Sequence, residues 1–101
     1  MTIGNLENLT QDIWTEFLRE IFHLQAGLTE PLKLELVEVN GSGTRRGERR
    51  SPFSLLFAAP LEPLLPQGIY TLHHPRMGDL ALFLVPQAPD AERLYYEAVF
   101  T

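Results

Sequence analysis

The chain has no cysteine among its 101 residues. This absence excludes disulfides, thiolate metal sites, iron–sulfur clusters and cysteine nucleophiles. The chain also lacks an apolar run of the ~18 residues that a membrane-spanning helix needs. Residues 1–14 lack the basic segment and apolar run of a signal peptide. We therefore expect a cytoplasmic location, no membrane partner and no cofactor.

Charge is unevenly distributed along the chain. The net charge is −5, and the shares of charged residues (21%) and hydrophobic residues (45%) are ordinary for one globular domain. One short segment holds Glu48 and four arginines and carries +3, so the remaining residues carry −8. These arginines are Arg45, Arg46, Arg49 and Arg50. We expect a single domain over residues 1–101, with a loose lead-in at 1–9 and a flexible basic loop at 41–52.

Apolar residues concentrate at 53–86, and we expect this stretch to supply most of the core. Alternating apolar positions between proline- and glycine-rich turns are typical of β-strands. Pro75 and Gly78 have the turn chemistry of a β-hairpin. The predicted strands are 32–39, 53–59, 69–74, 79–85 and 94–100. The predicted connections are an irregular crossing at 60–66, pinned by its leucines, and a loop at 86–92.

The N-terminal part of the chain predicts one short helix. Thr10 is a good N-cap, and an i, i+4 apolar stripe supports a helix over residues 11–19. Residues 21–26 fit either a continuation of this helix or a strand that pairs with 32–39. We prefer the strand, because Phe22 and Leu24 alternate with polar neighbours.

The element order favours a mainly β fold. No long helix alternates with the strands, so parallel βαβ topology is disfavoured. Short connections favour antiparallel neighbours. We therefore predict a short N-terminal helix followed by five or six antiparallel strands that form a small, strongly bent barrel.

The predicted strands 79–85 and 94–100 are apolar on both faces. A strand of this kind must be covered on both sides, and exposed apolar patches often mark interfaces. The helix can cover part of one face, and we expect another copy of the chain to cover the rest. The candidate self-association residues are Ala81, Phe83, Val85 and Tyr95.

His73 and His74 are adjacent, so they point to opposite faces of a strand and do not readily ligate one metal. We expect Asp79 to pair with one of them across the hairpin, in preference to a metal or acid–base site. No metal ligands are predicted.

Glu97 lies between apolar residues of the last predicted strand. We expect it to be partly buried and to pair with Arg93 or Arg76, which is a structural role. No serine lies in a G-x-S-x-G setting. We therefore predict no catalytic residue and no enzymatic activity.

The sequence carries FSLLF at 53–57, LLPQG-x-Y-x-L-x-HP at 64–75, G-x-L-x-LFLVP at 78–86 and YEAVF at 96–100. This pattern resembles a family of short bacterial proteins classed as a domain of unknown function. The resemblance spans most of the chain and implies no established activity. A helix followed by a small barrel also resembles the Sm-like fold, whose members are often ring-forming RNA binders; no uridine-pocket motif is recognisable here.

Three functional hypotheses follow. The leading one is a non-enzymatic binding or assembly domain that self-associates. The alternative is Sm-like RNA or other nucleic-acid binding through Arg45, Arg46, Arg49 and Arg50, which the acidic remainder of the chain disfavours. The third is a small-molecule or hydrolase site built from His73, His74, Asp79 and Glu97.

Overall fold

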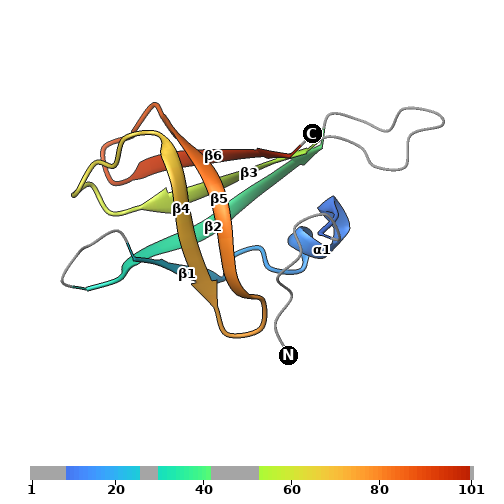
Figure 1. The fold of residues 1–101 in the computed structure, drawn as a ribbon. Helices are drawn as coiled ribbons and strands as arrows, with labels where there is room; N and C mark the ends of the chain where they lie inside the picture. Colours follow the sequence, from blue (N-terminus) through green and yellow to red (C-terminus); the bar gives the residue numbers. More distant parts are fainter. Residues whose placement is uncertain (1–8, 26–29, 42–52, 101) are drawn as a thin grey trace.

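In the part of the chain that the structure describes, the fold is a closed, six-stranded antiparallel barrel with one short helix (Figure 1). The computed structural model describes residues 9–25, 30–41 and 53–100. The strand order is β1-β2-β3-β6-β5-β4, and β4 closes the barrel by pairing with β1. The elements are α1 (Gln11–Thr15), β1 (Ile21–Leu24), β2 (Leu32–Gly41), β3 (Phe53–Ala59), β4 (Gly68–His74), β5 (Gly78–Gln87) and β6 (Leu94–Phe100). The predicted mainly β barrel is confirmed.

Alternation along the strands places the apolar side chains inside the barrel. On β5, Leu80, Leu82 and Leu84 are buried, whereas Ala81 and Phe83 between them are exposed. The same period of two runs through β2, β3 and β6. The inward positions and α1 form one continuous core.

A β-bulge interrupts this alternation in β2. Leu36 lies opposite Phe57, but the next pair is Glu38 opposite Leu56, so Val37 is an extra residue. Because a bulge shifts the phase of the side chains, Val39 packs against the core although it would otherwise point outward. Val37 and Glu38 are both left on the outer side of the barrel.

The predicted hairpin is confirmed between β4 and β5. His74 lies opposite Gly78, and Gly78 has a φ of 77°, a left-handed conformation that glycine adopts without steric cost. β5 runs on through Pro86 to Gln87, so the loop predicted at 86–92 starts later than expected. These last residues of β5 form its pairs with β6.

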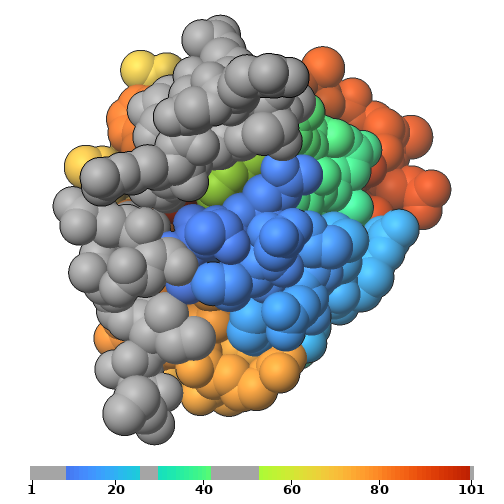
Figure 2. Space-filling view, turned by 90° about the vertical axis from the view of Figure 1, so that its right-hand side faces the viewer, coloured from blue at the N-terminus to red at the C-terminus, as the bar shows by residue number. Residues whose placement is uncertain are grey.

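Helix α1 begins at the predicted cap, where the Thr10 hydroxyl accepts the Ile13 N–H. The helix ends at Thr15, earlier than predicted, because the following turns use i to i−3 hydrogen bonds and Arg19 has a φ of 74°. Trp14 is fully buried, with ring centroids 5.9 Å from Phe22 and 5.8 Å from Phe100. Figure 2 shows α1, in blue, against this side of the barrel, with the orange β4–β5 turn below it.

Residues after the helix join the sheet at once. Arg19 donates its N–H to the Leu36 carbonyl at 2.8 Å, and Leu36 donates to the Glu20 carbonyl at 3.1 Å. The strand alternative for 21–26 is therefore confirmed over Ile21–Leu24, which pairs with β2 as predicted.

Two segments outside the strands differ in detail from the prediction. Leu9, which the sequence places in the lead-in, is fully buried in the core, while residues 1–8 lie outside the described residues. In the crossing between β3 and β4, Leu65 is buried and its N–H is bonded to the Tyr96 hydroxyl at 3.0 Å. Leu61 and Leu64 are exposed, so the leucines do not all pin this segment.

Candidate functional site

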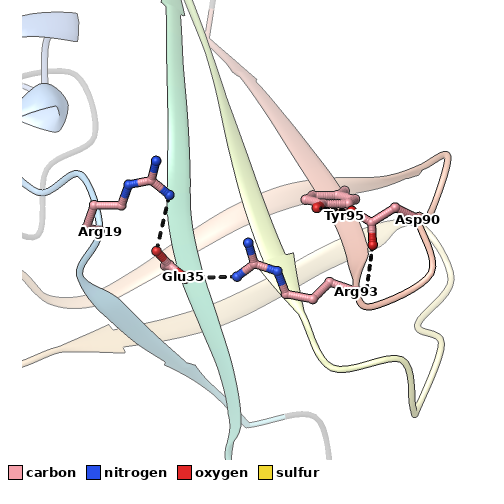
Figure 3. A network of polar contacts seen from close by, with 5 residues as sticks. All are labelled: Arg19, Glu35, Asp90, Arg93 and Tyr95. Carbon is pink, nitrogen blue, oxygen red and sulfur yellow. Dashed lines mark hydrogen bonds and ion pairs between the residues drawn. The ribbon is translucent and has the colours of Figure 1, made fainter.

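A row of charged side chains crosses the outer face of β2, β3 and β6 (Figure 3). Glu35, on β2, accepts an N–H of Arg93 at 2.8 Å and one of Arg19 at 3.4 Å. Arg19 reaches it from the segment before β1, and Arg93 reaches it from the residue before β6. The two guanidinium groups lie on opposite sides of the carboxylate, so one glutamate holds two cations that are far apart in sequence.

The contact between Glu35 and Arg93 spans the middle strand at Ala58. Ala58 lies opposite Glu35 on one side and Tyr95 on the other. It is only 2% exposed, although it belongs to the outer face and does not belong to the core cluster. Because the Ala58 side chain is small, the ion pair can cross the strand above it. The ion pair then covers Ala58, which explains why this outward residue is buried.

Asp90 fixes the other end of the row. Its carboxylate accepts the backbone N–H groups of Glu92 and Arg93, both at 2.8 Å, and the Tyr95 hydroxyl at 2.5 Å. These hydrogen bonds, the one from Tyr95 foremost, lower the pKa of Asp90. The same bond raises the pKa of Tyr95, and the bond to Glu35 raises the pKa of Arg93. The turn before β6 is therefore held in one geometry.

A cleft of about 560 Å³ adjoins this row. Its position follows from the bulge in β2, which leaves Val37 and Glu38 side by side on the outer surface, next to Leu56 of β3. The cleft thus combines two guanidinium groups, one carboxylate and several apolar groups. The lining residues are Arg19, Val37, Glu38, Leu56, Gln87, Ala88, Arg93 and Tyr95.

A second polar cluster joins the start of β1 to the β4–β5 turn. Glu20 contacts His74 Nε2 at 2.6 Å and Arg76 at 2.5 Å. The Arg76 backbone N–H donates to His74 Nδ1 at 3.1 Å, so Nδ1 is the acceptor and the proton lies on Nε2. The bond from Arg76 lowers the pKa of Glu20, against an opposing effect of burial.

The imidazole of this second cluster is not accessible to a ligand. Both ring nitrogens of His74 are engaged, its side chain is 4% exposed, and its ring packs on Phe17 and Phe22 at centroid distances of 5.0 and 4.8 Å. The Arg76 guanidinium lies 4.5 Å from the Phe17 ring centroid, a cation–π contact. The cluster therefore ties the segment between α1 and β1 to the hairpin.

An apolar surface covers the outer face of the β4–β5 hairpin. Ile69 and Phe83 are directly opposite each other and are 73% and 51% exposed. Next to them lie Thr71 opposite Ala81, and Val85 opposite Glu97 of β6. We call Ile69, Thr71, Ala81, Phe83 and Val85 the hairpin face. It contains three of the four predicted self-association residues, and the fourth, Tyr95, is half-buried in the charged row.

The predicted pair between Asp79 and a histidine is confirmed. His73 Nδ1 lies 2.7 Å from Asp79 Oδ1 on directly opposed residues, and both side chains are more than half exposed. His74 points to the other face, as predicted. Glu97 is half-buried as expected, but Arg93 and Arg76 pair with Glu35 and Glu20 instead. None of these four candidates lines the cleft.

The predicted arginine loop cannot be placed, because Arg45, Arg46, Arg49 and Arg50 lie outside the described residues. Nucleic-acid binding through them remains a prediction. Within the described ranges, no three histidine, aspartate or glutamate side chains are grouped to hold a metal ion. No helix in the same ranges is long and apolar enough to cross a membrane.

Sequence reasoning missed the charged row and the Glu20 cluster. Arg19, Glu20 and Glu35 showed only ordinary surface patterning, because a charge on a predicted strand or turn has no visible partner in the sequence. Glu35 on β2 can reach Arg93, next to β6, because a single strand, β3, lies between β2 and β6 in the barrel. Ala58 is a small residue at an outward position of β3, but Ser54 is another, so the sequence contains no specific signal for the ion pair.

These features define a small all-β barrel domain with a charged outer row, an adjoining cleft and an apolar hairpin face. Residues 9–100 match the family model described as "Domain of unknown function (DUF6916)". The chain therefore belongs to this family, as the sequence resemblance predicted. No curated protein and no solved structure matches the chain.

Proposed function

We propose that this protein is a binding and assembly domain that associates with a second copy of itself through the hairpin face. The observation that carries the proposal is the cross-strand pair of Ile69 and Phe83, 73% and 51% exposed. Two large apolar side chains paired on one outer face form a contiguous apolar surface, which is typical of interaction sites.

The charge distribution leaves the hairpin face open to a second copy as the occupant. The whole chain carries −5, so two molecules repel each other over most of their surfaces. Along the outward positions of β4 and β5, the only ionisable side chains are His73 and Asp79, which contact each other. The hairpin face between them and Gln87 carries no charge of its own, and Glu97 of β6 borders it at Val85. Two identical faces can meet around a two-fold axis at Ile69 and Phe83 without charged side chains within the face.

Sedimentation velocity of the full chain tests the proposal at concentrations between about 1 and 100 µM. This range detects a dimer with a dissociation constant in the micromolar range. We expect the sedimentation coefficient to rise with concentration from that of a monomer to that of a dimer. The double variant Ile69→Thr, Phe83→Ser should stay monomeric over this range, because the apolar pair is removed from positions that contribute little to the core.

Ile21→Thr is the matched control, since Ile21 is an exposed aliphatic residue of β1 outside the hairpin face. It should dimerise like the native chain. A native chain that is strictly monomeric at 100 µM would contradict the proposal, as would a double variant that dimerises normally.

A further inference from the structure

We propose that the cleft beside Arg93 is a binding site for a small organic carboxylate with an apolar body. Neither the family description nor the proposed assembly assigns a ligand to this part of the molecule. The cleft lies on the outer surface of β2 and β3, and none of its lining residues belongs to the hairpin face. At about 560 Å³ it has the size of small-molecule sites in proteins.

The cleft has unused hydrogen-bond donors of the kind that bind carboxylates. Each arginine carries five N–H donors, and Glu35 accepts one from Arg19 and one from Arg93. Donors therefore remain on both guanidinium groups, which line the cleft. The planar guanidinium matches the geometry of a carboxylate and can bind it through two parallel hydrogen bonds.

Arg93 is the principal anchor. Its side chain is 40% exposed, against 70% for Arg19, so it is partly shielded from water and its interactions are less screened. It is also held at both ends: Glu35 binds the guanidinium, and Asp90 accepts the Arg93 backbone N–H. Because this side chain is already ordered, less conformational entropy is lost when a ligand binds.

Arg19, which binds Glu35 from the side opposite to Arg93, has a strained backbone conformation that positions its side chain. A left-handed conformation is sterically costly for a non-glycine residue, yet residue 19 is an arginine at φ 74°. Strained residues of this kind concentrate at functional sites. Here the conformation directs the side chain to Glu35 and the cleft, whereas Glu20, the next residue, joins the His74 cluster.

The apolar part of the cleft defines the rest of the ligand. The bulge turns Val37 outward beside Leu56, and Ala88 directly follows β5. These three side chains provide a contact surface for a hydrocarbon or aromatic group. The Tyr95 ring adds to it, and its hydroxyl is already bonded to Asp90.

Charge favours a singly charged ligand. The lining contains two arginines and Glu38, and Glu35 binds both arginines, so these four side chains carry no net charge. A monocarboxylate therefore adds a single negative charge to the site. A doubly charged phosphate would place its second charge near Glu38 and Glu35, which opposes binding.

Titration of the ¹⁵N-labelled full chain with benzoate at low salt tests the proposal. We expect saturable amide shifts centred on Val37, Leu56 and Ala88, with a Kd of about 1 mM, the affinity of one ionic anchor and a small apolar contact. Benzamide has the same ring without the charge and should bind at least about tenfold more weakly.

Arg93→Gln should weaken benzoate binding about tenfold or more, because the main charge-assisted hydrogen bonds are lost. Arg93→Lys keeps the charge without the planar fork and should fall between Arg93→Gln and the native chain. Lys33→Gln is the charge-matched control, since Lys33 is an exposed cation of β2 outside the cleft, and it should bind benzoate like the native chain. If Arg93→Gln does not fold, Arg19→Gln replaces it, with a smaller loss expected.

The proposal is overturned by an absence of saturable shifts at up to about 10 mM benzoate, ten times the expected Kd. It is also overturned if Lys33→Gln weakens binding as much as the arginine variants do. Tighter binding of inorganic phosphate than of benzoate would reject the carboxylate assignment. Self-association is measured separately, so the two proposals can fail independently.

Discussion

Arg19 and Glu20 are neighbours in the chain, yet they belong to two different ionic clusters on two sides of the molecule. Glu20 joins His74 and Arg76 at the hairpin turn. Arg19 joins Glu35 and, through it, Arg93 on the outer face of β2. Both clusters consist of arginine and carboxylate groups, but their surroundings differ.

The His74 cluster is packed against the core. Aromatic rings cover the imidazole, and both of its nitrogens have partners. In the Glu35 row the arginines retain free donors and line a cleft. Exposure alone does not separate the two clusters, since the side chain of Arg76 is 62% exposed and that of Arg93 is 40% exposed. The difference is that the first cluster is built around the buried imidazole of His74, whereas the arginines of the Glu35 row border a cleft. Three substitutions test this division.

The largest effect is expected for His74→Ala. This change removes a buried ring, leaves a cavity beside Phe17 and Phe22, and deprives Glu20 of a hydrogen bond. We expect a loss of about 2–4 kcal/mol in the free energy of unfolding, measured with urea. His73→Ala is the control, because His73 is an exposed neighbour paired only with Asp79, and it should change stability by less than about 0.5 kcal/mol. Equal losses in the two variants would remove the distinction between the buried and exposed histidines.

Ala58→Leu should have an intermediate effect and should act on the Glu35 row alone. The larger side chain must displace the Arg93–Glu35 contact that crosses Ala58, which we expect to cost about 1–3 kcal/mol of stability. Benzoate binding should weaken as well, because Arg93 loses its fixed position. Ala81→Leu is the same substitution at an exposed outward position of β5, and it should leave both properties close to native at concentrations below dimerisation. An unaltered Arg93 side-chain resonance in Ala58→Leu would contradict the position assigned to the ion pair.

The smallest effect concerns the backbone at Arg19. Arg19→Gly and Arg19→Ala both lose the exposed contact with Glu35, but only alanine retains the cost of a left-handed conformation. We therefore expect the glycine variant to be more stable than the alanine variant by about 1 kcal/mol in urea unfolding. Equal stabilities would show that the left-handed conformation at this position is not strained.

The sequence allowed the local structure to be predicted well. Alternation of apolar residues located the strands, and Pro75 with Gly78 located the hairpin turn. The predicted contact of Asp79 with a histidine also followed locally, since residues on either side of a short turn must face each other. The errors lie at element ends: α1 stops at Thr15 and β5 reaches Gln87, because backbone hydrogen bonds to other segments decide these limits.

The candidate site was not predictable in the same way. The sequence by itself determined a small β domain with surplus apolar residues on the hairpin, because the period of two is a local property of each strand. Only the tertiary structure decided that β3 lies between β2 and β6, that Val37 is a bulge, and that Arg19 and Arg93 meet at Glu35. These contacts join residues far apart in the chain, and their partners are fixed by strand order and register, which no local pattern encodes.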